Sequence, residues 1–221
     1  MEIKNKTELD PVADLYMPDA YMRWALLAAE EVTGKRGLII VLRQSGLERL
    51  IDNYPPDRLT VSSDLTCKDY ANLFASLMNF YGRAGKSMLL RIGRLSAKHA
   101  IEQQGALFGL AAVLASKVLP IPAQLKIGLE NMQGGFRKIW QSFGQEMHLH
   151  VQDRGEKMVY VAETCTMCAG KQADGPICLS WTGALKESVH WVTGKEFEIE
   201  EVECRAMGAP ACVWEISKTP S

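Results

Sequence analysis

Five of the six cysteines of this 221-residue chain lie in its C-terminal quarter, and thiolates are strong ligands for soft and borderline metal ions. The five fall in three separate segments: Cys165, Cys168, Cys178, Cys204 and Cys212. A structural zinc ion takes four ligands at the corners of a tetrahedron. The cysteine pattern therefore predicts a metal site, with one more cysteine than zinc requires.

Three other uses of these cysteines remain open. Cys165 and Cys168 form a Cys-x2-Cys pair that could be redox-active, although no βαβ pattern typical of thioredoxin surrounds them. The thiols could also serve only as small buried hydrophobic groups. An iron–sulfur cluster, which likewise uses four thiolates, is the third alternative, and we favour zinc over it.

The cysteines are expected to follow or precede strands. Residues 147–152 alternate between apolar and polar types, and residues 158–161 continue as a second strand after a turn at 153–155, which predicts a hairpin. A helix over residues 179–193 should end at Gly194. Two further strands are expected at 197–202 and 211–216. If they pair antiparallel, Cys204 and Cys212 come close together.

Upstream of the hairpin the apolar periodicity is helical. Helices are expected over these ranges: 20–33 with Gly34 as C-cap, 37–44, 46–53, 66–81, 86–104 with a bend near Gly93, 105–118 as a buried helix, and a long helix from about residue 123 to 143. Thr66 does not begin a good capping box. Helices that precede antiparallel strands predict an α+β fold in which the helices pack on a small sheet.

Composition narrows the class of protein. With 47% hydrophobic and 23% charged residues, the chain is typical of a globular protein, and we expect one domain over residues 19–217 after a loose polar arm at 1–18. A net charge of −1 leaves no overall basic field for nucleic acid. Without an apolar leader or an 18-residue apolar run, we expect a cytoplasmic protein with no membrane span.

An aromatic stripe on the long helix could line a ligand chamber. It contains Phe136, Trp140 and Phe143, and Phe108 and Leu110 on the preceding apolar segment could join it. Such a stripe is more often ordinary core, so this is an expectation to test. His148 and His150 should lie on the solvent face of their strand, and no residue is assigned a catalytic role.

Two stretches resemble the 4-vinyl reductase domain family, also called the hydrocarbon-binding domain. The C-terminal stretch is Pro176-Ile177-Cys178, a helix centred on Gly183, and then Glu203-Cys204-Arg205-Ala206-Met207-Gly208-Ala209-Pro210-Ala211-Cys212-Val213-Trp214. The N-terminal stretch runs from Glu31-Val32-Thr33-Gly34 to Leu42-Arg43-Gln44-Ser45-Gly46-Leu47. The resemblance thus covers residues 20–217.

The resemblance implies a fold, a ligand and a metal. The family includes a small protein of bacteriochlorophyll synthesis and the aromatic-sensing domains of some transcription activators, and it shares its fold with nitric-oxide-sensing haem domains and vesicle-tethering subunits. It implies a homodimer with a buried apolar chamber and a zinc held by three cysteines and a glutamate. The cysteines correspond to Cys178, Cys204 and Cys212. Cys165 or Cys168 could take the fourth place, with Glu163 as the fallback.

Three functions are compatible with these features. The first is a sensor or carrier that binds a hydrophobic small molecule, with zinc as a structural ion. The second is a tetrapyrrole vinyl reductase or its accessory protein, although the chain has no Gly-x-Gly-x-x-Gly after a strand and no flavin-type site. The third is a protein–protein interaction or tethering subunit. We favour the first, which is not an enzyme.

Overall fold

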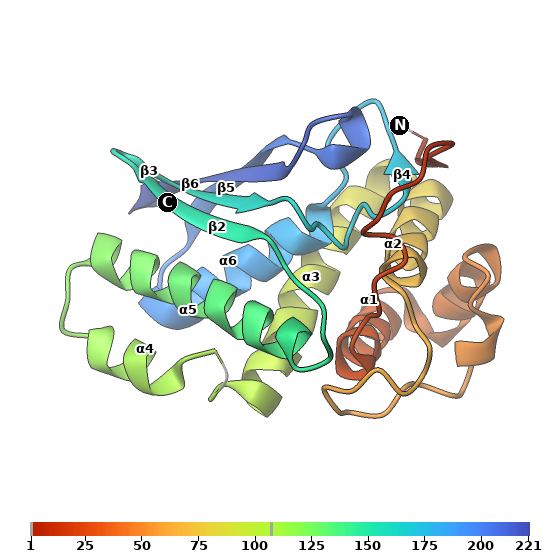
Figure 1. The fold of residues 1–221 in the computed structure, drawn as a ribbon, viewed down its shortest axis with the longest axis horizontal. Coiled ribbons are helices and arrows are strands. Elements are labelled where there is room, and N and C mark those ends of the chain that lie inside the picture. Colours follow the sequence, from red (N-terminus) through yellow and green to blue (C-terminus); the bar gives the residue numbers. More distant parts are fainter. Residues whose placement is uncertain (1, 107) are drawn as a thin grey trace.

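The computed structural model describes residues 2–106 and 108–221. Five helices precede a four-stranded antiparallel sheet, and a sixth helix packs beneath that sheet (Figure 1). This arrangement confirms the α+β prediction. No helix in the described ranges is long and apolar enough to cross a membrane.

The N-terminal half consists of α1 (Asp19–Gln44), the 3-10 turn η1 (Glu48–Leu50), α2 (Cys67–Tyr81) and α3 (Arg83–Gln104). Gly34 interrupts α1 with φ 71° and ψ 160°, at the place where a helix end was expected. The helix expected over 46–53 is reduced to η1, because Gly46 and Asp52 both have positive φ and break the helical path.

The start of α2 corrects the expectation for Thr66. The Thr66 hydroxyl accepts a hydrogen bond from the Asp69 amide at 3.2 Å, and the Asp69 carboxylate accepts one from the Thr66 amide at 3.1 Å. These two bonds form a complete capping box in which aspartate replaces the usual glutamate. The shorter side chain still reaches the helix start, so the expectation of no capping box was wrong.

The apolar segment 105–118 also differs from expectation. Only α4 (Leu110–Ser116) is helical, and it begins after Gly109, whose φ is 76°. Leu114 and Val118 are 61% and 88% exposed, so a helix buried on all sides was wrong. The long helix α5 (Ile121–Gln141) follows and runs below the sheet (Figure 1).

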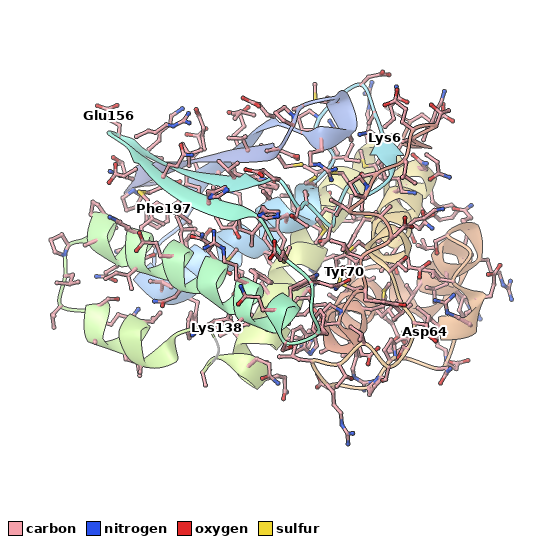
Figure 2. All side chains as sticks on the ribbon, in the orientation of Figure 1. Lys6, Asp64, Tyr70, Lys138, Glu156 and Phe197 are labelled. Carbon is pink, nitrogen blue, oxygen red and sulfur yellow. The ribbon has the colours of Figure 1, made fainter. Side chains whose placement is uncertain are left out.

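The main sheet has the strand order β2-β3-β6-β5, formed by β2 (Leu149–Arg154), β3 (Lys157–Ala162), β6 (Cys212–Pro220) and β5 (Phe197–Glu203). All neighbours are antiparallel, and the β2–β3 hairpin is confirmed, with Glu156 at its tip (Figure 2). Tyr160 pairs with Trp214, and Ala162 pairs with Cys212. The register therefore places Cys212 beside the end of β3, where the Cys-x2-Cys loop begins.

Helix α6 (Leu179–Thr193) crosses α3 at very short range. A Cβ on Gly93 would lie 1.9 Å from the Ser180 carbonyl oxygen, and one on Gly183 would lie 2.1 Å from the Leu90 carbonyl oxygen. The two backbones touch because neither position carries a side chain. Trp214 of β6 donates its indole N–H to the Thr182 hydroxyl at 3.0 Å, which fixes α6 to the sheet.

The first eighteen residues are packed onto the domain, unlike the loose arm that was expected. Strand β1 (Lys4–Asn5) pairs with β4 (Lys171–Gln172), and Met17 is fully buried. The buried carboxylate of Asp10 accepts a hydrogen bond from the Gly170 amide and pairs with Arg205 at 2.7 Å. These contacts attach the N-terminal segment to the cysteine-bearing region.

Candidate functional site

The five C-terminal cysteines converge in one buried group, which we call the thiol cluster: Cys165, Cys168, Cys178, Cys204 and Cys212. Each is placed by the end of a different local structure. Cys165 and Cys168 lie in the loop after β3, Cys178 immediately precedes α6, and Cys204 and Cys212 flank the connection between β5 and β6. The 3-10 turn η2 (Arg205–Met207) closes that connection.

The sulfur atoms are within metal-bridging distance of one another. The Sγ–Sγ separations are 3.6 Å for Cys165–Cys178, 3.4 Å for Cys168–Cys212, 3.7 Å for Cys178–Cys212, 3.8 Å for Cys178–Cys204 and 3.9 Å for Cys204–Cys212. The expected approach of Cys204 to Cys212 is thus present. The cluster could hold a metal ion.

Glu201 belongs to the same site and was missed by the sequence reasoning. Its carboxylate lies within 4.8 Å of the sulfurs of Cys178, Cys204 and Cys212. The side chain is 8% exposed, and one oxygen accepts a hydrogen bond from the Cys178 amide at 2.8 Å. The other oxygen has no hydrogen-bond partner among the described residues.

The fallback ligand Glu163 lies elsewhere. Its side chain is 53% exposed, and its carboxylate contacts His150 at 3.2 Å on the solvent side of the hairpin. A signal for Glu201 was present in the sequence, because it continues the alternation of Phe197 and Ile199 along β5. A glutamate on the buried face of a strand, three residues before Cys204, is unusual enough to have identified it.

Charge in the cluster is controlled by burial and by the neighbouring thiols. Burial, together with the nearby thiols of Cys204 and Cys165, raises the pKa of Glu201 to about 9. Hydrogen bonds from Cys168, Cys178 and Cys212 lower the pKa of Cys165, whereas burial raises the pKa of Cys178. A bound cation would favour the ionised form of all these groups, which is the usual effect of a metal on its ligands.

A second feature is an apolar cavity, which we call the chamber. It contains about 860 Å³ of space, much of it in narrow clefts between side chains. Its walls come from α1, α2, α3, α5, α6, the segment after α3 and the loops that flank β2 and β3: Tyr21, Trp24, Tyr70, Gly93, Ser96, Ala97, Ala100, Ile101, Phe108, Gly128, Met132, Phe136, Trp140, Met147, Thr166, Met167, Ser180, Trp181, Ala184, Ser188, Trp191 and Val192. Figure 2 shows Tyr70 inside the molecule. None of these lining residues is charged.

Three hydrogen-bond donors in the chamber walls have no acceptor among the described residues. They are the Tyr21 hydroxyl and the indole N–H groups of Trp140 and Trp181. The indole N–H of Trp24, by contrast, donates to Asp57 at 2.9 Å. An unpaired buried donor costs about 1–3 kcal/mol, so three in one cavity are a notable concentration of unsatisfied polarity.

The thiol cluster and the chamber share two segments. Thr166 and Met167 lie between Cys165 and Cys168 in the sequence and line the chamber. Cys178 precedes α6, whose Trp181 also lines the chamber and contacts Phe136 with ring centroids 5.0 Å apart. Ligands on the cysteines would therefore fix part of the chamber wall.

Residues 158–218 match the family model of the 4-vinyl reductase domain. No curated protein matches the chain. Several solved structures do, at low sequence identity. One is described as an oxygen-binding H-NOX domain related to soluble guanylate cyclases; it is 14% identical, covers 92% of this chain and 96% of its own, and has a TM-score of 0.56. An H-NOX variant from T. Tengcongensis is 16% identical, with coverages of 92% and 99% and a TM-score of 0.56.

A third structure, whose title concerns modulation of heme redox potential through porphyrin distortion, is 15% identical. It covers 91% of this chain and 99% of its own, with a TM-score of 0.57. The family match contains β3, α6, β5 and β6 with all five clustered cysteines, so the recognised family is confirmed over that segment. The H-NOX structures extend the shared fold over nearly the whole chain.

The segment that matches the family contributes Trp181 to the chamber, and the helices before it contribute most of the rest. Of the residues expected in the chamber, the structure places Phe108, Phe136 and Trp140 in its walls. Phe143 packs on Trp140 with ring centroids 5.9 Å apart and does not line the cavity, and the Leu110 side chain lies outside the described part. Tyr21 and Trp181 were not expected there; they carry two of the unpaired donors.

Proposed function

We propose that this protein is a small-molecule sensor or carrier that binds an uncharged, apolar or aromatic ligand with a hydrogen-bond acceptor. The observation that carries this proposal is the chamber, where aromatic walls surround the three unpaired donors of Tyr21, Trp140 and Trp181. Ligand pockets of about 300–1,000 Å³ with apolar walls and a few polar groups are the usual form of such sites. A ligand oxygen would accept hydrogen bonds from these donors.

The chamber does not fit haem, although the H-NOX fold raises that possibility. The four histidines of the chain, His99, His148, His150 and His190, are all absent from the lining residues. No lysine or arginine among the described lining residues could pair with the two carboxylates of haem. Methionine and tyrosine remain as possible axial donors, but buried unpaired carboxylates are costly. A neutral ligand is the better match.

We further propose that the thiol cluster holds zinc in a structural role. Thiolates and a carboxylate are ligands that zinc accepts, and a site closed by four protein ligands is typical of structural rather than catalytic zinc. Zinc would join the loop after β3 to the start of α6 and to the β5–β6 connection. Because this loop and α6 also line the chamber, the ion would hold part of the chamber wall in place.

We also propose a homodimer, as the family resemblance implies. Exposed apolar side chains on and after α4, among them Leu114 and Val118, offer contact surface for a second copy. Light scattering of the reduced protein should give twice the monomer mass of 24.5 kDa. A monomer at micromolar concentration would exclude this part of the proposal.

The ligand proposal is tested with a pair of tricyclic probes of nearly equal shape. Fluorenone has a carbonyl where fluorene has a methylene group, so any difference in affinity reports the acceptor. Titration by tryptophan fluorescence should show saturable binding of both, with fluorenone about tenfold tighter, as one net hydrogen bond predicts. No saturable binding of either probe would reject the chamber as a ligand site.

Matched variants locate the effect. Trp181→Phe removes an unpaired N–H and should abolish most of the preference for fluorenone. Trp24→Phe removes an N–H that already donates to Asp57, so the preference should persist. Ala184→Trp should fill the chamber and block both probes. Oxidation of NAD(P)H by the protein with a vinyl-bearing tetrapyrrole would favour the reductase alternative instead.

A further inference from the structure

The thiol cluster offers more ligands than one metal ion can use. Two sets of four donors each have all their ligand atoms within 4.8 Å of one another. The first set is Cys165, Cys168, Cys178 and Cys212, and the second is Cys178, Glu201, Cys204 and Cys212. The sets overlap in Cys178 and Cys212 only, so together they contain six donors.

The distances match two tetrahedra that share an edge. With a zinc–sulfur bond of about 2.3 Å, adjacent sulfurs of a tetrahedral site lie about 3.8 Å apart. The shared pair, Cys178 and Cys212, is separated by 3.7 Å. Contacts from this pair to Cys165 and Cys168 measure 3.6 and 3.4 Å, and contacts to Cys204 measure 3.8 and 3.9 Å. Both sides of the shared edge therefore have the spacing of a metal–thiolate site.

Ligand counting leads to the same arrangement. One four-coordinate ion would leave two of the six donors buried without a metal. If that ion used the first set, the carboxylate of Glu201 would remain 8% exposed with one oxygen unpaired, which is costly. Two four-coordinate ions need eight ligand positions. Six donors supply eight positions when Cys178 and Cys212 each bind both ions.

The charge of such a centre is also reasonable. Five thiolates and one carboxylate carry −6, and two divalent ions reduce this to −2, which equals the charge of one zinc with four thiolates. The Arg205 amide donates to the Cys212 sulfur at 3.3 Å. The Arg205 guanidinium is held nearby by Asp10, and its Nη1 has no partner among the described residues, so positive charge is available beside the cluster.

We propose that the thiol cluster is a binuclear centre that binds two zinc ions, with the thiolates of Cys178 and Cys212 bridging them. One ion is completed by Cys165 and Cys168, and the other by Glu201 and Cys204. This inference rests on the proposed metal site and adds its stoichiometry. It gives the Cys-x2-Cys pair and Glu201 separate roles in place of competition for one position.

The test is the number of zinc ions bound per chain. Untagged full-length protein, reduced and loaded with zinc, is passed over a desalting column and analysed by elemental analysis and native mass spectrometry. Two ions per chain are expected. One ion would overturn the binuclear centre and leave the single zinc site intact, whereas no ion would reject both proposals. Iron with labile sulfide would likewise reject both.

Paired variants assign the ions to their ligands. Cys165→Ser with Cys168→Ser should bind one ion, and Glu201→Gln with Cys204→Ser should also bind one. Cys67→Ser changes the buried cysteine outside the cluster and should still bind two. If Cys165→Ser with Cys168→Ser keeps two ions, or if it folds with none, the assignment is overturned.

A measurement on the unaltered protein avoids dependence on the folding of variants. Substitution with cadmium-113 should give two NMR resonances that are coupled to each other through the bridging sulfurs. A single resonance at full loading, or two without mutual coupling, would contradict the bridge. The coupling tests Cys178 and Cys212 directly, because only shared ligands connect the two ions through bonds.

Discussion

The thiol cluster and the chamber are neighbours that treat buried polar groups in opposite ways. In the cluster each sulfur has at least one other sulfur within 4 Å, and a metal would use these contacts to hold three chain segments together. In the chamber three donors have no acceptor among the described residues. The difference separates a region that stabilises the fold from a region that sacrifices stability for recognition.

The largest expected effect comes from breaking the cluster. Cys212→Ser removes a ligand that belongs to both donor sets, and structural zinc contributes folding free energy directly. The free energy of unfolding should fall by an amount on the order of 5 kcal/mol. Chemical denaturation followed by circular dichroism, with reductant and zinc present, measures this change.

Cys67→Ser is the control for the loss of a buried sulfur. Cys67 is fully buried at the start of α2 and belongs to neither donor set. Its substitution should cost about 1 kcal/mol, in the usual range for a conservative core change. Equal losses for Cys67→Ser and Cys212→Ser would mean that the cluster stabilises the fold only by packing.

Asp19 shows what complete pairing of a buried polar group is worth. Its carboxylate accepts four hydrogen bonds, from the amides of Ser62 and Ser63 and the hydroxyls of Thr60 and Ser62, at 2.7–3.0 Å. Asp19→Asn places an amide N–H against donors, so the free energy of unfolding at pH 7 should fall by about 3 kcal/mol. Denaturant titration of both proteins measures the difference.

The pH dependence of this difference is fixed by the pKa shift. Burial raises the pKa of Asp19, but the hydrogen bonds from Ser62, Ser63 and Thr60 outweigh it and lower the pKa overall. A lowered folded pKa contributes stability above the unfolded value of about 3.9, and this stability is lost as pH falls through the folded pKa. The difference between Asp19→Asn and the unaltered protein should therefore shrink below about pH 4. A constant difference would refute the charge argument.

The joint between α3 and α6 predicts a smaller effect that reaches both regions. Gly93→Ala places a methyl group where the Ser180 carbonyl oxygen lies 1.9 Å away, so the helices must separate at a cost of about 1–3 kcal/mol. Gly134→Ala is the control, because a Cβ there meets nothing within 4 Å and alanine favours helix. Thermal unfolding should show Gly93→Ala destabilised and Gly134→Ala unchanged or stabilised. The opposite order would contradict the close crossing.

The sequence was most informative where rare residue types carry the site. Five cysteines in three segments predicted their own convergence, and the glycine-proline turn before Cys212 predicted the pairing of β5 with β6. Glu201 was harder to find, because glutamate is a common surface residue. Only its place in the buried alternation of β5 distinguishes it from Glu200 and Glu203.

The chamber was less predictable for a physical reason. Periodicity identifies which face of a helix is apolar, but the same face can pack tightly or border a cavity. Phe136 and Trp140 border the cavity, whereas Phe143, one turn after Ile139, packs beside it. Which of these occurs depends on how α5 sits against α1 and α6, and this is decided by contacts between distant segments.

The smallest expected change in stability is the most informative about function. Tyr21 is almost fully buried, and burial raises the pKa of its hydroxyl well above the ordinary value, so it is a neutral donor at every physiological pH. In ligand-free protein Tyr21→Phe removes an unpaired hydroxyl and should raise the free energy of unfolding by up to about 1 kcal/mol. The same variant should lose part of its preference for fluorenone over fluorene. A residue that served only as core would show no change in preference, and a hydroxyl that stabilised the fold would show a loss of stability. A gain in stability together with a loss of discrimination is therefore the result that separates recognition from packing at this position.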